Sequence, residues 1–502
     1  MALVLIIMGI YKASIFNYIF NSVNTVVVII NGIVMIPIYF RFMSVATYGA
    51  WLATGNLVAM IGLLESGFAS VITQKMSEAI TQSNNTLFQT LAGANILTAL
   101  IMSATILILG LAISPFITVL INIDKNIQHD ILIAYIISLF SSCIALLVSI
   151  FGAFPQVWQD TKTVGMISVI VNMVAVFSLI IYLFMGLGVI SIALSYLTRA
   201  ILNLLFQGSW IIKKWKRNSI PVPIFCLNEV KSLFRDCIYP FLSKLSGIMM
   251  SNSQSLIISY FMNPAIAAIY DLTAKICYVA CSFVSTTNGS FFALFSLTLA
   301  SKDQIKINNV FRITSQFFII SLGIVMTFSI CFTRPIMYYW VGLDKFGGFL
   351  LLVLIVISTV AFQLKSYCNN ILYTGGLIKK SAKLDILCMG SYIIVLLVMI
   401  KRMQEYAIPI AALITSLVFI GLYMKLMSNR LYIDITYMLK KLIQCLIISS
   451  IFVLVDLFLH VDFRSIFIYI VYFVIFCIIY CLVLYFTNKN FICQLRLIFK
   501  RK

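Results

Sequence analysis

Uninterrupted apolar runs recur along the whole chain and are separated by short polar segments. An apolar helix of about 20 residues is long enough to cross the hydrocarbon core of a bilayer. In hydrocarbon the backbone must satisfy its own hydrogen bonds, so only helices and closed barrels can span a membrane. Barrel strands would read as short alternating segments, and these runs do not alternate. With 62% hydrophobic and 10% charged residues, the sequence predicts an all-α polytopic membrane protein.

The apolar runs predict about fourteen transmembrane helices. Their predicted ranges are 15–40, 48–72, 87–113, 131–153, 163–184, 188–212, 237–262, 266–298, 312–333, 348–373, 380–400, 406–427, 437–459 and 465–486. No connecting segment is long enough to fold into a catalytic domain outside the membrane. We therefore expect a protein that is not an enzyme, with its chemistry confined to the space between helices.

The formal net charge of +20 comes mostly from Lys and Arg in the short connections between spans. With both termini in the cytoplasm, 24 basic residues fall on the cytoplasmic side and seven on the opposite side. This asymmetry is typical of membrane topology and sets the expected orientation. It does not form the basic face of a compact domain, so we expect no nucleic-acid partner.

Weak internal similarity divides the first twelve spans into two sets of six, at an offset of about 220 residues. An even number of spans in each copy gives both the same orientation, and two such lobes enclose a central cavity. The predicted organisation is an N-lobe at 1–212, a cytoplasmic inter-lobe loop at 213–236, a C-lobe at 237–427, and two extra spans with a basic tail at 428–502. The matching pairs are Tyr39-Phe40 with Tyr260-Phe261, Asn84-Asn85 with Asn308-Asn309, and Ile192-Ala193-Leu194 with Ala411-Ala412-Leu413.

Several charged residues lie inside the predicted spans. A charge at the centre of a membrane helix costs about 2.5–3.5 kcal/mol on insertion scales, so such residues usually face a partner or a polar cavity. Four cations, Arg199, Lys244, Lys275 and Lys365, are therefore candidate contacts for an anionic cargo. The alternatives are a structural i,i+4 pair of Asp271 with Lys275, helix packing for Arg199, and Lys244 and Lys365 reaching the membrane surface.

Two acidic residues are candidates for ion coupling, Glu65 in the second span and Asp271 in the eighth. A carboxylate in a desolvated site can exchange a proton or bind Na⁺, so we expect coupling to H⁺ or Na⁺ without a cofactor. Glu65 could equally pair with Lys75. His129 and His460 lie far apart in the sequence, and we expect no metal site.

A short sequence pattern near the N-terminus consists of Pro37 late in the first span, Tyr48-Gly49 and Trp51 opening the second, and a Leu64-Glu65-Ser66-Gly67 turn. This pattern resembles the polysaccharide-exporter branch of the multidrug/oligosaccharidyl-lipid/polysaccharide (MOP) superfamily, and within it the O-antigen flippases of the Wzx type. The resemblance covers about 16–427. The second-half residues that fit the pattern are Tyr270, Pro335, Trp340-Val341-Gly342, Gly375-Gly376 and Lys379-Lys380.

The resemblance implies a two-lobed, MATE-like core of twelve helices with two appended helices. The implied activity is to move an undecaprenyl-diphosphate-linked oligosaccharide, such as an O-antigen repeat of lipopolysaccharide, across the bacterial inner membrane. A polysaccharide polymerase and a chain-length regulator are the implied partners, besides the lipid-linked cargo and membrane lipids. Where this chain has Glu65 the family often has Asp. The alternatives are an ion-coupled multidrug antiporter, a lipid II flippase, and a membrane-embedded polymerase or acyltransferase.

Overall fold

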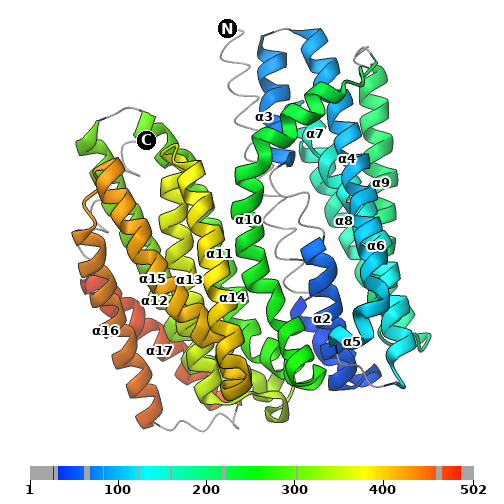
Figure 1. The fold of residues 1–502 in the computed structure, drawn as a ribbon. Helices are drawn as coiled ribbons and strands as arrows, with labels where there is room; N and C mark the ends of the chain where they lie inside the picture. Colours follow the sequence, from blue (N-terminus) through cyan, green and yellow to red (C-terminus); the bar gives the residue numbers. More distant parts are fainter. Residues whose placement is uncertain are drawn as a thin grey trace. The chain divides into compact units, whose positions relative to one another are not determined.

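The computed structural model describes residues 27, 32–61, 68–82, 84–121, 125–158, 161–217, 222–300, 303–459 and 466–487. Within these residues the regular structure is helical, with no strand (Figure 1). Nine helical stretches of the described chain are long and apolar enough to cross a membrane. The fold is therefore the all-α polytopic membrane protein that the apolar runs predicted.

The chain forms two compact units. The first contains residues 1–271 and 385–405, and the second contains 272–384 and 406–502, so α11 and α14 contribute to both. The first unit includes α2 (Val45–Ile61), α3 (Phe68–Thr81), α4 (Asn85–Ile113), η2 (Ser114–Phe116), α5 (Ile117–Ile121), α6 (Gln128–Phe151), α7 (Ala153–Val157), α8 (Thr161–Phe184), α9 (Ile190–Arg217) and α10 (Leu227–Phe261). The helices that are shared by the two units or belong to the second are α11 (Pro264–Ala300), α12 (Gln304–Trp340), η3 (Leu343–Lys345), α13 (Phe349–Thr374), α14 (Ile378–Met403), η4 (Gln404–Tyr406), α15 (Ala407–Leu431), α16 (Thr436–Leu459) and α17 (Ile466–Thr487).

Most predicted spans coincide with observed helices, one interval differs, and most of the predicted span 15–40 lies outside the described residues. The interval 213–236, predicted as a loop, is largely helical, because α9 continues to Arg217 and α10 begins at Leu227. The predicted span 48–72 contains most of α2 and the start of α3, and residues 62–67 between them lie outside the described residues. Hydropathy locates the apolar part of a helix, whereas backbone hydrogen bonds continue into its polar end turns. The predicted boundaries of the two lobes stay a prediction.

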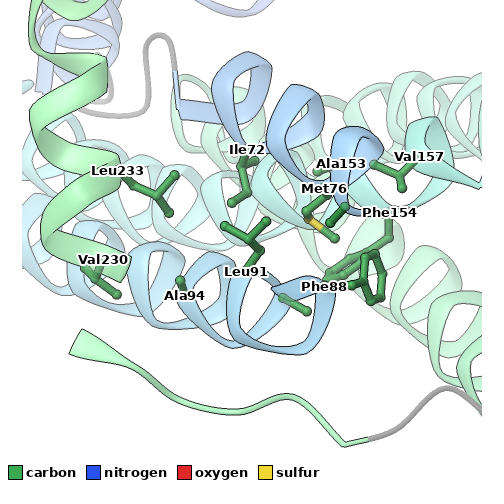
Figure 2. Packing of buried hydrophobic residues seen from close by; sticks show 12 residues of the cluster. Ile72, Met76, Phe88, Leu91, Ala94, Ala153, Phe154, Val157, Val230 and Leu233 are labelled. Carbon is green, nitrogen blue, oxygen red and sulfur yellow. The ribbon is translucent and has the colours of Figure 1, made fainter. Parts of the chain in front are cut away.

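One end of the first unit is held by an apolar cluster that joins four helices (Figure 2). Ile72 and Met76 of α3 pack against Leu91 of α4, Phe154 of α7 and Leu233 of α10. Each of these side chains is at most 2% exposed. Close packing of this kind fixes the relative positions of the helices, since removing a buried side chain leaves a cavity that the neighbours fill only in part.

A close backbone approach in the first unit joins α2 to the start of α11. A Cβ atom added to Gly49 would lie 1.7 Å from the carbonyl oxygen of Pro264, so only glycine fits at this position. The neighbouring Tyr48 and Trp51 side chains are both buried. Packing thus accounts for the Tyr48-Gly49 and Trp51 pattern that the sequence displays.

In the second unit, α16 packs along α12 through a series of polar contacts, and the two helices lie side by side in Figure 1. Arg312 forms an ion pair with Asp434 at 3.1 Å, and Tyr437 donates a hydrogen bond to Oε1 of Gln316 at 2.5 Å. Further along, the Cys445 thiol donates to the carbonyl of Ile319. In hydrocarbon, helices associate by packing and interhelical hydrogen bonds rather than by the hydrophobic effect. These bonds therefore attach the first appended helix to the second unit.

Candidate functional site

A polar cavity of about 400 Å³ lies within the first unit, between α6, α8 and α9. Most of its lining side chains are polar, although the three helices are otherwise strongly apolar. Polar side chains inside membrane helices mark the routes and sites of polar ligands. The cavity is lined by Ser141, Ser142, Ala145, Val148, Ser149, Ser168, Asn172, Tyr196, Arg199, Ala200, Asn203 and Gln207.

One stripe of α9 supplies the largest polar groups. Arg199, Asn203 and Gln207 are four residues apart, so they lie on one face of the helix, and Tyr196 lies one turn before Arg199. Gln207 donates from Nε2 to Oδ1 of Asn203 at 2.9 Å, and Asn203 donates from Nδ2 to the carbonyl of Arg199 at 3.0 Å. The two amides are therefore oriented by bonds along their own helix.

Hydrogen bonds between α8 and α9 fix the walls of the cavity. Nε2 of Gln207 also donates to Oγ of Ser168 on α8 at 3.2 Å. Nearer the start of α9, the Ser195 hydroxyl donates to the carbonyl of Ala175 at 2.8 Å. The ring of Tyr196 lies 5.9 Å from the ring of Trp51 on α2. These contacts hold the α9 stripe in place before any ligand arrives.

Arg199 is the charged group of this cavity. It lies nine residues after the start of α9, or roughly 14 Å along a helix that rises 1.5 Å per residue. Its side chain is exposed, and the described residues that line the cavity include no carboxylate. Within the described part of the chain, none of the ion pairs involves Arg199. A guanidinium at this depth therefore faces a polar space that favours an anion.

The other three predicted cations lie on three further helices. Lys244 is exposed on α10 of the first unit, and Lys275 is half-buried on α11 in the part that belongs to the second unit. Lys365 on α13 is only 3% exposed, and its Nζ lies 4.8 Å from the centre of the Phe362 ring. A cation over an aromatic face is stabilised by the ring quadrupole, so the Phe362 ring contributes to holding Lys365 in its buried position. The roles predicted for all three lysines stay predictions.

The two predicted coupling carboxylates have different outcomes. Glu65 lies outside the described residues. Asp271 is half-buried on α11, and one oxygen of its carboxylate is fully buried. A role for either residue in ion coupling stays a prediction.

Two further carboxylates, which were not among the predicted site residues, lie within membrane helices. Asp385 on α14 is 3% exposed and accepts a hydrogen bond from the Ser243 hydroxyl of α10, within the first unit. Asp456 on α16 accepts a hydrogen bond from the Tyr472 hydroxyl of α17 at 2.5 Å. Both lie inside predicted spans, 380–400 and 437–459, so a search of the spans for every acidic residue would have found them. The cavity amides Asn172, Asn203 and Gln207 carry no charge and gave no such signal.

Comparison with solved structures finds the same fold in membrane transporters at low sequence identity. The lipid II flippase MurJ in an inward closed conformation matches with a TM-score of 0.69 at 15% identity, covering 95% of this chain and all of that one. An inward-facing multidrug resistance MATE family transporter of the MOP superfamily matches with a TM-score of 0.66 at 14% identity, over 81% of this chain and 95% of the other. A mutant of the Vibrio cholerae MATE transporter VcmN matches with a TM-score of 0.61 at 13% identity, over 84% and 99%. No curated protein matches the sequence.

A family model described as polysaccharide biosynthesis protein matches residues 15–299, which is more than half of the chain and includes the whole cavity. This match confirms the predicted polysaccharide family, and the MurJ and MATE structures confirm the predicted fold of the MOP superfamily. The chain belongs to the polysaccharide biosynthesis protein family and has the polytopic helical fold of MOP-superfamily transporters.

Proposed function

We propose that this protein is a flippase that moves an undecaprenyl-diphosphate-linked oligosaccharide across the bacterial inner membrane by alternating access. The observation that carries the proposal is Arg199, exposed in a polar cavity with no carboxylate among the described residues that line it. The family match supports a role in building polysaccharide. Cargo of this class joins an apolar lipid to an anionic diphosphate and a hydroxyl-rich glycan.

The physical difficulty of the reaction lies in the polar part of the cargo. The lipid tail is stable in hydrocarbon. A diphosphate and a glycan, in contrast, lose their hydrogen bonds to water when they enter the membrane. The protein must replace those bonds with its own donors and acceptors. A cavity that offers serine hydroxyls, side-chain amides and a guanidinium within membrane helices supplies such groups.

The electrostatics favour an anionic cargo over a cationic drug. A site for a cationic drug would be stabilised by carboxylates, and none is found among the lining residues that the structure describes. We propose that Arg199, Lys244, Lys275 and Lys365 contact the anionic groups of the cargo during translocation. Arg can bind them through two parallel hydrogen bonds, and Lys offers a compact charge.

The remaining parts of the proposal concern the coupling ion, the orientation in the membrane and the partners. H⁺ or Na⁺ is the proposed coupling ion, with Glu65 and Asp271 as its carboxylates. Both termini are proposed to face the cytoplasm, as the distribution of basic residues predicts. A polysaccharide polymerase and a chain-length regulator are the proposed partners that use the flipped product.

Reconstituted transport tests the function. Liposomes holding the purified full-length protein would receive a fluorescent undecaprenyl-diphosphate oligosaccharide, and its transfer between leaflets would be followed by quenching. Wild type should flip the cargo, Arg199→Ala should lose at least about tenfold in rate, and Arg199→Lys should lose less because it retains the charge. Lys216→Ala is the matched control, since Lys216 is an exposed cation on α9 that does not line the cavity.

Two results would contradict the proposal. One is the absence of flipping by wild type in liposomes where the same protein takes up a cationic dye under a pH or Na⁺ gradient, which would indicate a multidrug antiporter. The other is glycan polymerisation or acyl transfer by the purified protein, which would indicate a membrane enzyme.

A further inference from the structure

We propose that the cavity between α6, α8 and α9 is a saccharide-binding site that selects a sugar bearing a carboxylate. That this sugar belongs to the glycan of the cargo is the part that rests on the proposed function. The inference assigns Arg199 to the glycan, and leaves the diphosphate to the cations on the other helices.

The uncharged groups of the cavity suit a sugar. A sugar hydroxyl both donates and accepts hydrogen bonds, so its site needs groups that do the same. Side-chain amides and serine hydroxyls have this property, and the lining includes Asn172, Asn203, Gln207 and Ser168. A diphosphate only accepts hydrogen bonds, so the amide and hydroxyl oxygens of this cavity would find no donor on it.

The cavity also has an aromatic surface beside its polar side chains. Tyr196 lies one turn before Arg199 and is 46% exposed, and its ring is packed against Trp51. An aromatic ring with a polar tip offers an apolar face and a hydroxyl to the same ligand. The C–H faces of a sugar ring can lie on such a face, while the sugar hydroxyls reach the amides.

The charge of the cavity specifies the kind of sugar. Arg199 brings one positive charge, and no lining residue within the described part of the chain is negative. A sugar carboxylate carries one negative charge and matches the planar fork of the guanidinium with two hydrogen bonds. A diphosphate carries more than one negative charge and would stay partly uncompensated in a low-dielectric site.

The polar side chains of the cavity are held in position before a ligand binds. Asn203 and Gln207 are oriented by bonds to Arg199, to each other and to Ser168, which reduces the cost of ordering them on binding. Among the contacts of the described residues, none engages the guanidinium of Arg199. The charged group therefore stays available while the amide groups around it are fixed.

The test measures binding of free saccharides, without lipid or phosphate, to the full-length protein in nanodiscs by calorimetry. The probes are matched oligosaccharide pairs, each pair differing only in a carboxylate: glucuronate against glucose, galacturonate against galactose, and N-acetylneuraminate against its carboxamide. Inorganic diphosphate serves as a competitor. At least one acidic probe should bind at least about tenfold more tightly than its neutral partner, since hydrogen bonds to a charged group are worth about 1.5–3 kcal/mol.

Two variants separate recognition from folding. Arg199→Gln should abolish the preference, so that the acidic and neutral probes bind with similar affinity. Asn203→Asp nearly preserves side-chain shape but places a carboxylate one turn from Arg199, where it can pair with the guanidinium. It should therefore weaken the acidic probe at least about tenfold more than the neutral probe, whereas Asn203→Ser should weaken both probes alike and keep the preference.

Three outcomes would overturn the inference: no probe binds, acidic and neutral probes bind equally, or inorganic diphosphate displaces the acidic probe. The liposome assay distinguishes these from failure of the proposed function. Intact flipping with no carboxylate preference would overturn the saccharide site alone. A carboxylate preference without flipping would overturn the flippase function and leave the saccharide site standing.

Discussion

Asn203 donates a hydrogen bond from its side-chain Nδ2 to the backbone carbonyl of Arg199, 3.0 Å away and one turn earlier on α9. The bond turns the amide along the helix and leaves the guanidinium of Arg199 free to face the cavity. Gln207 extends the same arrangement by one turn and connects it to Ser168 of α8. These hydrogen bonds thus fix the polar side chains that surround Arg199 within the membrane helices.

The side chains of Gln207 and Ser168 should stabilise the fold jointly, through the hydrogen bond between them. Gln207 is 7% exposed, so Gln207→Leu would leave the Ser168 hydroxyl without this donor and should cost about 0.5–1.5 kcal/mol. Ser168→Ala should cost a similar amount, and the double variant should cost less than the sum of the two. Relative thermal unfolding in nanodiscs measures the effect. Strictly additive losses would show that the two side chains do not interact.

Gly49→Ala should severely disturb the first unit. The added methyl would lie 1.7 Å from the carbonyl oxygen of Pro264, and a backbone atom cannot move away without shifting α2 or α11. We expect a loss of about 1–3 kcal/mol or failure to accumulate in the membrane. Fluorescence-detected size-exclusion chromatography after heating measures this loss.

Gly55→Ala is the matched control on the same helix. Its added methyl would meet nothing within 4 Å, and alanine favours a helix over glycine by about 1 kcal/mol. Gly55→Ala should therefore be neutral or slightly stabilising. Equal damage from both substitutions would contradict the close approach of α2 and α11.

Gly323→Ala should loosen α16 from α12, and a second substitution should repair it. The added methyl would lie 2.2 Å from Sγ of Cys445. Cys445→Ala removes that sulfur, so the double variant should recover most of the stability that Gly323→Ala loses. Protease sensitivity of the α15–α16 connection reports the change. A double variant less stable than Gly323→Ala would contradict the predicted contact.

Acid should weaken the ion pair of Arg312 with Asp434 at the start of α16. The Arg312 guanidinium, and then the Thr436 hydroxyl and amide, hold the pKa of the Asp434 carboxyl below its usual range. A carboxyl group whose pKa is lowered by folding stabilises the folded state. This contribution is present at pH values above the pKa of the unfolded state, about 4, and is lost as the pH falls through the pKa of the folded state. The pair is partly exposed, so the effect should be about 1 kcal/mol or less.

Hydrogen exchange at the start of α16 would measure this loss between neutral pH and pH about 3. Exchange should quicken as the pH falls, after correction for the intrinsic rate. Asp434→Asn should exchange at a nearly constant corrected rate over the same range. An identical pH profile in wild type and Asp434→Asn would assign the change to other groups.

The sequence by itself determined that this chain folds as a polytopic helical membrane protein, and it placed most of the spans. The reason is local, because each apolar run must be a helix to satisfy its backbone in hydrocarbon, whatever its neighbours are. The end turns of α9 and α10 were assigned to a loop, since their polar residues lie outside the apolar run while their backbone bonds continue. Arg199 was identified as a candidate for the same local reason, as a charge inside a span.

Only the tertiary structure decided what surrounds Arg199. Ser141 of α6 and Asn172 of α8 lie 58 and 27 residues before it in the sequence, and helix packing brings all three to one cavity. Hydropathy cannot show which face of a helix meets which neighbour, because in lipid both faces of a span are apolar. Uncharged side chains such as Asn203 and Gln207 are also too common in sequence to attract notice. Their place in the site is recognised only from the hydrogen bonds that join them to one another, to Arg199 and to Ser168.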